Sequence, residues 1–208
     1  MEKRGLRVLP VSPSSPRQEK GEKRERENGT GKRIDAEYEI NNVVLTVSYK
    51  DAELDLEKVA SALEGARYDP EVFAALIYKT SEPQASFLIF ASGKANCVGA
   101  RTVEGAEKAI ENLTVKLQDL GYDVGEPETE VQNMVASVEF HRRFDLEDIA
   151  RNFRHAEYEP EVFPRLVFRI EGTSVAFLLF VQGEAVCVGA KSEEEIEKGI
   201  DRILGALE

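Results

Sequence analysis

Two cysteines occupy equivalent places in two similar stretches of the chain, and their type and spacing could serve metal or redox chemistry. Cys97 lies in "LIFASGKANCVGAR" and Cys187, 90 positions later, lies in "LLFVQGEAVCVGAK". Neither cysteine has a CxxC partner or a nearby histidine, so the spacing does not match a metal site. Their apolar neighbours are typical of small residues packed on the inner side of a strand. A disulfide between them is the alternative, which a reducing compartment disfavours.

The other groups that catalysis would need stand apart from one another. His141 and His155 have no partner in a recognisable motif, and both are interpreted as surface or cap residues. The sequence contains no nucleophile–base pair, no phosphate-binding glycine loop and no cluster of metal ligands. We therefore expect a protein without enzymatic activity and without a cofactor.

The composition is that of a globular protein without a membrane span. Of the 208 residues, 42% are hydrophobic and 32% are charged. The longest apolar run covers Val175–Val181, far short of the ~20 residues that a membrane helix needs. No basic start followed by an apolar stretch opens the sequence. We therefore expect a cytoplasmic protein with no contact to a membrane.

Charge is distributed unevenly along the chain. The net charge is −12, which by itself argues against nucleic acid as a partner. Residues 1–33, however, hold ten Lys/Arg against five Glu, so this segment is +5 and the remainder is −17. Because the segment is almost free of apolar residues after Val11, it is predicted to be a disordered basic tail. The alternative is a solvated tail with no specific role.

The rest of the chain contains an internal sequence repeat. Residues 54–113 match residues 144–203 at 24 of 60 positions. A two-unit repeat of this length indicates two copies of one α+β unit related by an approximate two-fold axis. We expect a first repeat over residues 34–124 and a second over 125–208. The matched landmarks include Asp55/Asp145, Tyr68/Tyr158, Pro70/Pro160, Phe73/Phe163, Phe90/Phe180 and Gly99/Gly189.

Each repeat predicts the same series of elements. A strand comes first, over Ile40–Ser48 or Val131–Glu139, and a helix with one apolar face follows, opened by Asp55 or Asp145. Four short strands and a long closing helix complete each repeat.

In the second copy, Ser192 and Glu195 form a capping box at the start of the closing helix. Its predicted apolar stripe consists of Ile196, Ile200, Ile203, Leu204 and Leu207.

The predicted strands are apolar on both sides. In "SFLIF", Phe87 and Ile89 point to one side of the strand, while Leu88 and Phe90 point to the other. Two helices per repeat are enough to cover only one face of a sheet. About ten strands therefore leave a second face that is apolar, uncharged and bare, and a bare apolar face of this extent predicts a binding surface.

Several repeated motifs identify a family. These are "YDPEVF" and "YEPEVF", "IFASG" and "LFVQG", "NNVV" and "QNMV", and "GAR" and "GAK" before each closing helix. Over residues 38–208 the chain resembles the TATA-binding protein family, most of all its archaeal members. The resemblance implies an α+β saddle, in which a curved ten-stranded antiparallel sheet carries four helices on its convex face.

The family resemblance also implies a function. The concave face would bind and bend A·T-rich promoter DNA through the minor groove, in a nucleoid-associated protein of a prokaryotic cell. The protein would then recruit transcription factor B and, indirectly, RNA polymerase.

The family's functional residues can be carried over to matching positions. The residues implied to wedge between base steps are Phe73, Phe90, Phe163 and Phe180. The implied minor-groove contacts are Asn42, Asn133, Val44, Val135, Leu88, Leu178, Asn96, Val98, Val186 and Val188. The implied phosphate contacts are Lys79, Lys94, Arg101, Arg169 and Lys191. The implied contacts to transcription factor B are Glu159, Glu161 and Val162.

Some positions depart from the family pattern. Val98 and Val188 replace threonines whose hydroxyls would give central hydrogen bonds, and Asn96 replaces an apolar residue. Glu184 stands where a lysine would contact phosphate, and Gln182 replaces the serine of the turn. These changes predict weaker DNA binding in the second half and a specialised paralogue.

Two alternatives to a promoter-binding initiation factor stay open. One is a regulator that keeps the saddle but has weakened DNA readout and acts mainly through protein partners. The other is an accessory domain of an enzyme, against which two full halves and the lack of a catalytic domain argue.

Overall fold

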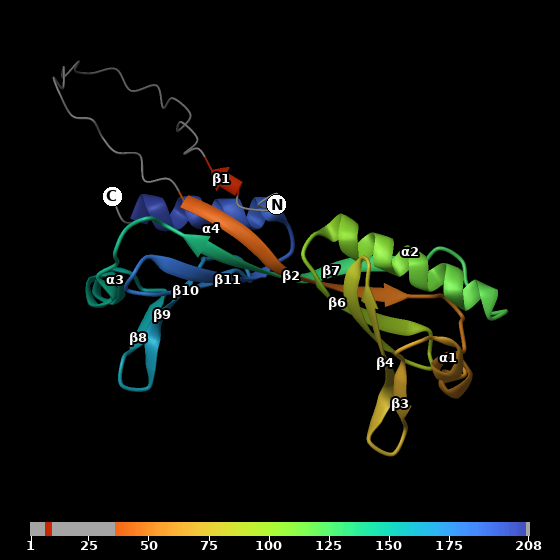
Figure 1. Cartoon of the computed structure of the whole chain (residues 1–208). Helices are drawn as coiled ribbons and strands as arrows, with labels where there is room; N and C mark the ends of the chain where they lie inside the picture. Colours follow the sequence, from red (N-terminus) through yellow and green to blue (C-terminus); the bar gives the residue numbers. More distant parts are fainter. Residues whose placement is uncertain (1–6, 10–35, 207–208) are drawn as a thin grey trace.

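The two repeats form one continuous antiparallel sheet that is bent into a saddle. The computed structural model describes residues 7–9 and 36–206, and Figure 1 shows the arch of the sheet with long helices above it. Along the sheet the strand order is β3-β4-β5-β6-β2-β7-β11-β10-β9-β8. An additional short strand, β1, pairs with β2 and is not part of this order. Equivalent strands of the two repeats follow in the same order from each edge of the sheet to its centre. The pseudo-two-fold axis therefore passes between β2 and β7. These findings confirm the predicted α+β class and saddle.

The elements of the first half run from β2 to α2. They are β2 (Ala36–Ser48), α1 (Leu56–Ala62), β3 (Arg67–Asp69), β4 (Phe73–Ser81), β5 (Gln84–Ile89), β6 (Lys94–Ala100) and α2 (Val103–Asp119). Those of the second half are β7 (Glu128–Glu139), α3 (Leu146–Asn152), β8 (Ala156–Glu159), β9 (Phe163–Arg169), β10 (Ala176–Leu179), β11 (Glu184–Ala190) and α4 (Glu193–Ala206). β2 begins four residues and β7 three residues before the predicted start. The reason is that the two strands pair with each other along almost their whole length, from Glu37↔Glu139 to Ser48↔Glu128.

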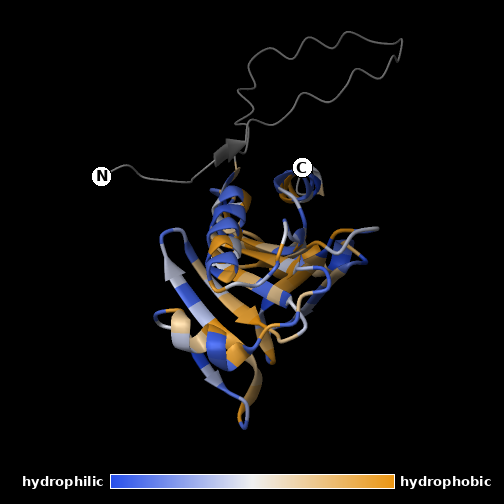
Figure 2. Cartoon of the chain, turned by 90° about the vertical axis from the view of Figure 1, so that its right-hand side faces the viewer, coloured by the Kyte–Doolittle hydropathy of each residue, from blue (hydrophilic) through white to orange (hydrophobic). Residues whose placement is uncertain are grey.

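The core lies between the sheet and the helices. Phe87 and Ile89 in β5 are fully buried, whereas Leu88 between them is half-buried, so the predicted alternation is confirmed. In Figure 2 the hydrophobic colour lies mainly on the sheet, and the outward turns of the helices are hydrophilic. The helices therefore cover one face and leave the concave face open.

The short helices begin where the sequence predicts. The carboxylate of Asp55 accepts hydrogen bonds from the backbone N–H groups of Glu57 and Lys58, each over 3.1 Å. Asp145 caps α3 in the same way by accepting from the N–H of Asp148 over 3.0 Å. Each cap satisfies donors that the first turn of a helix leaves without partners.

The capping box of α4 differs in one bond from the prediction. The Ser192 hydroxyl accepts from the N–H of Glu195 over 3.2 Å, as expected. The Glu195 carboxylate, however, accepts from the N–H of Lys191 over 2.7 Å, one residue before the cap. The predicted stripe is buried from Ile196 to Leu204, and its last member, Leu207, lies outside the described residues.

A short strand joins the sheet where the sequence predicts a disordered tail. Arg7–Leu9 form β1, which pairs antiparallel with β2 so that Leu9 faces Ala36 and Arg7 faces Tyr38. The expectation of disorder is therefore wrong for these three residues, and the remainder of the predicted tail lies outside the described residues. No helix in the described part of the chain is long and apolar enough to cross a membrane.

Both cysteines are buried free thiols, which excludes the disulfide alternative. Cys97 and Cys187 are fully buried on the helix-covered side of β6 and β11. Burial raises the pKa of Cys97 to about 11. Burial, with the nearby carboxylate of Glu195, raises the pKa of Cys187 to about 12. Both thiols therefore stay protonated at neutral pH.

We predict that the folded protein resists thiol reagents at pH 8. The thiolate is the reactive form, and here it is both scarce and inaccessible. Mass spectrometry after treatment with iodoacetamide should find no alkylation in the native protein and alkylation of both cysteines in guanidinium. Rapid alkylation of the native protein would show that β6 or β11 opens readily.

Candidate nucleic-acid interface

The residues predicted to contact DNA bases gather on the open face of the sheet. In β2, Val44 lies between buried Val43 and Leu45, and Val135 in β7 lies between buried Met134 and Ala136. Alternation therefore points both valines away from the core. The same pattern of half-burial holds for Asn42, Asn133, Val44, Val135, Leu88, Leu178, Asn96, Val98, Val186 and Val188.

Each half has a β-bulge at a repeated glycine near the centre of this face. The pairing of β2 with β6 shifts between Leu45↔Cys97 and Val43↔Ala100, so β6 has one extra residue at Val98–Gly99. The pairing of β11 with β7 shifts in the same way before Ala190. Gly99 and Gly189 have φ values of 89° and 85°, a region that glycine adopts without strain.

The two predicted asparagines complete these bulges. The side-chain oxygen of Asn42 accepts a hydrogen bond from the N–H of Gly99 over 2.7 Å. Asn133 accepts from the N–H of Gly189 over 2.8 Å. Because a backbone N–H can only donate, these bonds fix which end of each amide is the oxygen. The NH2 group of each side chain is left as a donor near the middle of the open face.

The four phenylalanines lie at the two ends of the open face. Phe73 and Phe163 begin β4 and β9 at the hairpins that project downward in Figure 1. Their side chains are 46% and 38% exposed, which is unusual for phenylalanine in a protein with a well-filled core. Phe90 and Phe180 directly follow β5 and β10 and are half-buried. None of the four belongs to the buried core.

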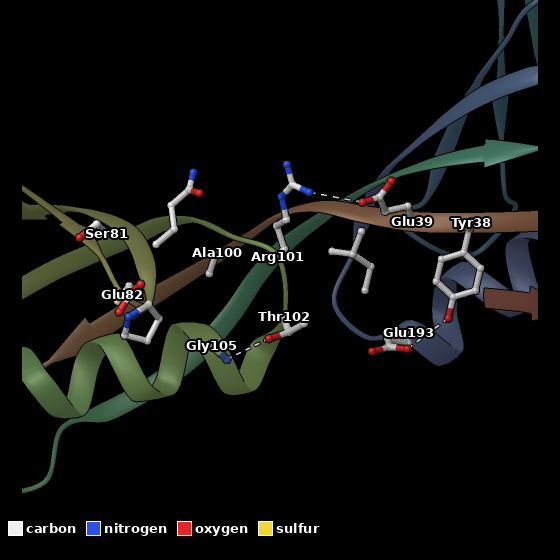
Figure 3. Close-up of a pocket in the computed structure, with 12 residues that line it drawn as sticks. Tyr38, Glu39, Ser81, Glu82, Ala100, Arg101, Thr102, Gly105 and Glu193 are labelled. Carbon is white, nitrogen blue, oxygen red and sulfur yellow. Dashed lines mark hydrogen bonds and ion pairs between the residues drawn. The ribbon is translucent and has the colours of Figure 1, made fainter. Parts of the chain in front are cut away.

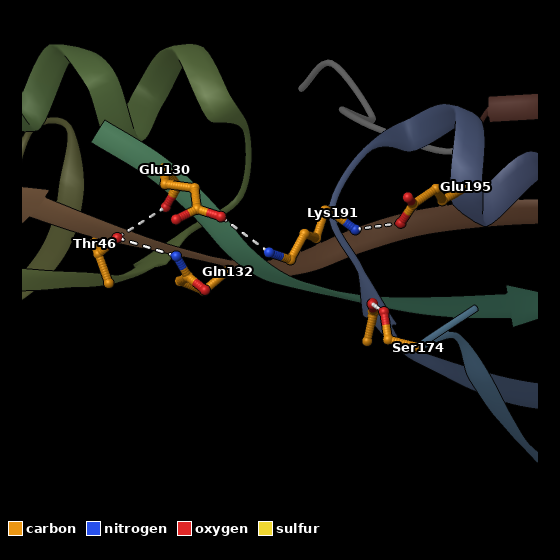
Figure 4. Close-up of polar contacts among 7 residues, drawn as sticks. Thr46, Glu130, Gln132, Ser174, Lys191 and Glu195 are labelled. Carbon is orange, nitrogen blue, oxygen red and sulfur yellow. Dashed lines mark hydrogen bonds and ion pairs between the residues drawn. The ribbon is translucent and has the colours of Figure 1, made fainter. Parts of the chain in front are cut away.

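Three of the five predicted phosphate contacts are paired with carboxylates. Arg101 Nη1 lies 3.4 Å from Glu39 Oε1 (Figure 3), and Arg169 Nε lies 3.6 Å from Glu157 Oε1. Lys191 Nζ lies 3.0 Å from Glu130 Oε1, as Figure 4 shows.

Glu130, the partner of Lys191, is also close to Gln132. The hydrogen bond from Lys191 lowers the pKa of Glu130 most, and the hydrogen bond from Gln132 lowers it further. Lys79 and Lys94, by contrast, have no ion pair within the described residues. DNA phosphates would thus compete with these glutamates for three of the cations.

A row of glutamates crosses the open face in the second half. Glu139 in β7 is paired directly with Glu37 in β2 and with Glu184 in β11, so the three carboxylates share one side of the sheet. His141 lies 3.6 Å from both Glu37 and Glu139. The expectation of an uncharged face is therefore wrong at this end. The corresponding row in the first half has Lys94 at the position of Glu184.

A cavity of about 720 Å³ lies at the side of the saddle where the halves meet. At one end of it Tyr38 from β2 contacts α4, with its hydroxyl 3.1 Å from carboxylate oxygens of both Glu193 and Glu197. Burial, followed by the charges of these carboxylates, raises the pKa of Tyr38, so the phenol keeps its proton as a donor. Figure 3 shows the contact of Tyr38 with Glu193, which ties the second-half helix to the first-half strand.

The residues predicted to bind transcription factor B lie at the tip of the β8–β9 hairpin. Glu159 and Glu161 are exposed, and Val162 is 79% exposed. A backbone bond from the N–H of Val162 to the carbonyl of Glu159 closes the turn over 3.0 Å. The hairpin therefore presents an exposed apolar side chain next to two exposed carboxylates.

Comparison with known proteins places this geometry in a family. The model of the family "Transcription factor TFIID (or TATA-binding protein, TBP)" matches residues 37–120 and 128–208. The chain belongs to the TATA-binding protein family. It is 43% identical to the TATA-box-binding protein of Methanocaldococcus jannaschii, covering 85% of this chain and 96% of that protein.

Further relatives agree with this assignment. TATA-box-binding protein 3 of Methanosarcina acetivorans is 45% identical over 77% of this chain and 89% of its own length. The solved structure of Methanococcus jannaschii TBP superposes with a TM-score of 0.74, over 81% of this chain and 97% of that one. The chain thus spans nearly the whole length of these members of the TATA-binding protein family.

Sequence reasoning missed some residues that shape the interface. The positioning role of Gly99 and Gly189 could have been inferred, since both recur in the repeat next to a strand that needs a bulge. Glu130 gave no signal, because its partner Lys191 is distant in sequence and reaches it only through sheet register.

We predict that Asn42→Ala destabilises the fold, whereas Asn42→Asp does so much less. Alanine leaves the Gly99 N–H without its acceptor, at a cost of about 1–3 kcal/mol, and aspartate keeps an acceptor oxygen. Urea unfolding would measure the free energy of each variant. Asn41→Ala is the matched control, since Asn41 is exposed and the one hydrogen bond that it accepts, from the Ser137 hydroxyl, is exposed to water too, so stability should change by no more than about 0.5 kcal/mol. Equal losses at both asparagines would contradict the role of Asn42 in the bulge.

Proposed function

We propose that this protein is a transcription initiation factor that binds A·T-rich promoter DNA through the minor groove and bends it. The observation that carries this proposal is the open face itself, with two oriented amide donors at its centre and, at each end, one exposed and one half-buried phenylalanine outside the core. Membership of the TATA-binding protein family supports it. No catalytic role is assigned to any residue.

The chemistry of the central face suits A·T pairs. In the minor groove an A·T pair presents only acceptors, adenine N3 and thymine O2, whereas a G·C pair adds the amino group of guanine. Because the oxygens of Asn42 and Asn133 are already occupied, their NH2 groups can donate to those acceptors. A guanine amino group would find no free acceptor on Asn42 or Asn133, because both amide oxygens are occupied. The face therefore favours A·T-rich sequences.

The ends of the face would carry out the bending. Phe73 with Phe90, and Phe163 with Phe180, would insert into base steps on either side of the central segment. Unstacking costs a few kcal/mol per step, which the additional contact between bent DNA and a curved surface offsets. Exposed rings that are held on strand ends can insert without disturbing the core.

The β8–β9 hairpin is the proposed site for transcription factor B, through Glu159, Glu161 and Val162. Its exposed valine next to two carboxylates suits a partner with a basic and partly apolar surface. RNA polymerase would be recruited indirectly, through transcription factor B.

A second candidate function is a regulator with weakened DNA readout. The row of three glutamates in the second half and the carboxylates beside Arg101, Arg169 and Lys191 favour it, since both lower the attraction for phosphate. Val98 and Val188 would also offer no hydroxyl to the bases. A titration of A·T-rich and G·C-rich duplexes, with and without transcription factor B, separates the two functions. Tight, A·T-selective binding by the protein alone supports the initiation factor, whereas binding only with transcription factor B supports the regulator.

We predict that Phe163→Ala combined with Phe180→Ala abolishes the bend at one end while the fold persists. Fluorescence energy transfer between the ends of a labelled duplex would report bending, and urea unfolding would report stability. The control is Phe177→Ala, because Phe177 is fully buried and its loss should cost about 3–5 kcal/mol. If the double variant unfolds as easily as the control, the two rings belong to the core and the wedge assignment is wrong.

We predict that Glu184→Lys tightens DNA binding and makes it more dependent on salt. The change removes a like-charge pair with Glu139 and adds a cation, and one new phosphate contact should steepen the slope of log affinity against log salt by about 0.9. Glu107→Lys changes the net charge equally on exposed α2, on the convex side. A slope that both variants share would mean that net charge alone, and not position, governs the effect.

A further inference from the structure

Arg165 contacts both phenylalanines of the second-half wedge pair, Phe163 and Phe180. Its guanidinium carbon lies 5.0 Å from the ring centre of Phe163 and 4.9 Å from that of Phe180. These distances are those of cation–π contacts with both rings. Arg165 lies in β9 beside fully buried Leu166, so alternation places it on the open face with the rings.

The first half has no equivalent of this arrangement. The residue 90 positions before Arg165 is Ala75, which is 2% exposed and carries no charge. Phe73 and Phe90 have no cation–π contact among the described residues, and Arg165 has no ion pair among them. The second half thus holds an uncompensated positive charge at its wedge, close to the region where Glu184 replaces a cation.

The contact with the rings can persist only while their faces are free. If Phe163 and Phe180 enter a base step, bases cover the ring faces and displace the guanidinium. A half-buried arginine that loses this partner needs a new one, since an unpaired charge at a closed interface is costly. The groups nearest to an opened base step are the phosphates on either side of the groove, and a guanidinium binds phosphate through two parallel hydrogen bonds.

We propose that Arg165 is a DNA-contacting residue of the second half, which stacks on the wedge rings in the free protein and transfers to a backbone phosphate beside the kink in the complex. This inference rests on the proposed function, because it requires that Phe163 and Phe180 insert into DNA. The transfer supplies a phosphate contact in the half where the row of glutamates opposes one.

Four variants of the full chain, measured beside the wild type, test this proposal. Arg165→Ala gives the second half the residue that the first half has at Ala75, Arg165→Gln keeps bulk without charge, and Arg165→Lys keeps charge without a planar group. Arg151→Ala is the control, because Arg151 is an exposed arginine on α3, where its partner is Glu147 on the same helix. Each variant is titrated with a TATA-like duplex at several potassium chloride concentrations, and its stability is checked by urea unfolding.

We expect DNA binding to depend less on salt only in the variants that remove the positive charge of residue 165. Arg165→Ala and Arg165→Gln should make the negative slope of log affinity against log salt shallower by about 0.9, so that their affinity relative to wild type falls about eightfold for each tenfold decrease in salt. Arg165→Lys and Arg151→Ala should keep the wild-type slope. An unchanged slope in Arg165→Ala and Arg165→Gln, with wild-type binding intact, overturns the phosphate contact and leaves Arg165 as a packing residue. If the wild type binds no duplex, the proposed function itself fails, and the Arg165 proposal fails with it.

Discussion

The pairing of β2 with β7 is the contact on which the rest of the structure depends. These two strands run antiparallel through the middle of the sheet and join two repeats that would otherwise each have an open edge. Because this pairing joins the halves into one sheet, the long helices α2 and α4 lie on the same side of it (Figure 1), and the opposite face extends across both halves. It also sets the bulges of β6 and β11 symmetrically about the centre, so that Asn42 and Asn133 point their amides at the same short stretch of the open face.

The open face combines a neutral centre with charged ends, and the charges are not symmetric. The first half carries Lys94 where the second carries Glu184, whereas the second carries Arg165 where the first carries Ala75. Cross-strand carboxylates also engage several cations, such as Lys191 with Glu130. These ion pairs hold the cations in place, and a phosphate that binds Arg101, Arg169 or Lys191 must exchange with a carboxylate already present. In the proposed complex, shape and base-edge contacts would therefore carry a larger share of recognition than in a strongly basic protein.

Much of the fold could be predicted because the signals are local or repeated. Alternation in "SFLIF" predicted which side of β5 is buried, and Asp55 and Asp145 marked two helix starts through a bond within one turn. The position of the candidate site followed from the repeat and the family motifs. Interactions that depend on register between distant strands could not be predicted, and the glutamate row and the ion pair of Lys191 belong to this class. The stacking of Arg165 depends on side-chain conformations that a sequence pattern does not specify.

The terminal strands of the sheet bear on how the protein behaves in a concentrated solution. A broad sheet with one uncovered apolar face is at risk of adding further strands at its edges and growing into aggregates. Here the outermost strands, β3 and β8, have only three and four residues, and they carry Arg67 and Asp69, and Glu157 and Glu159. Such short, charged edges offer few backbone groups to a second chain. The protein can thus keep a large exposed binding face while its edges discourage self-association.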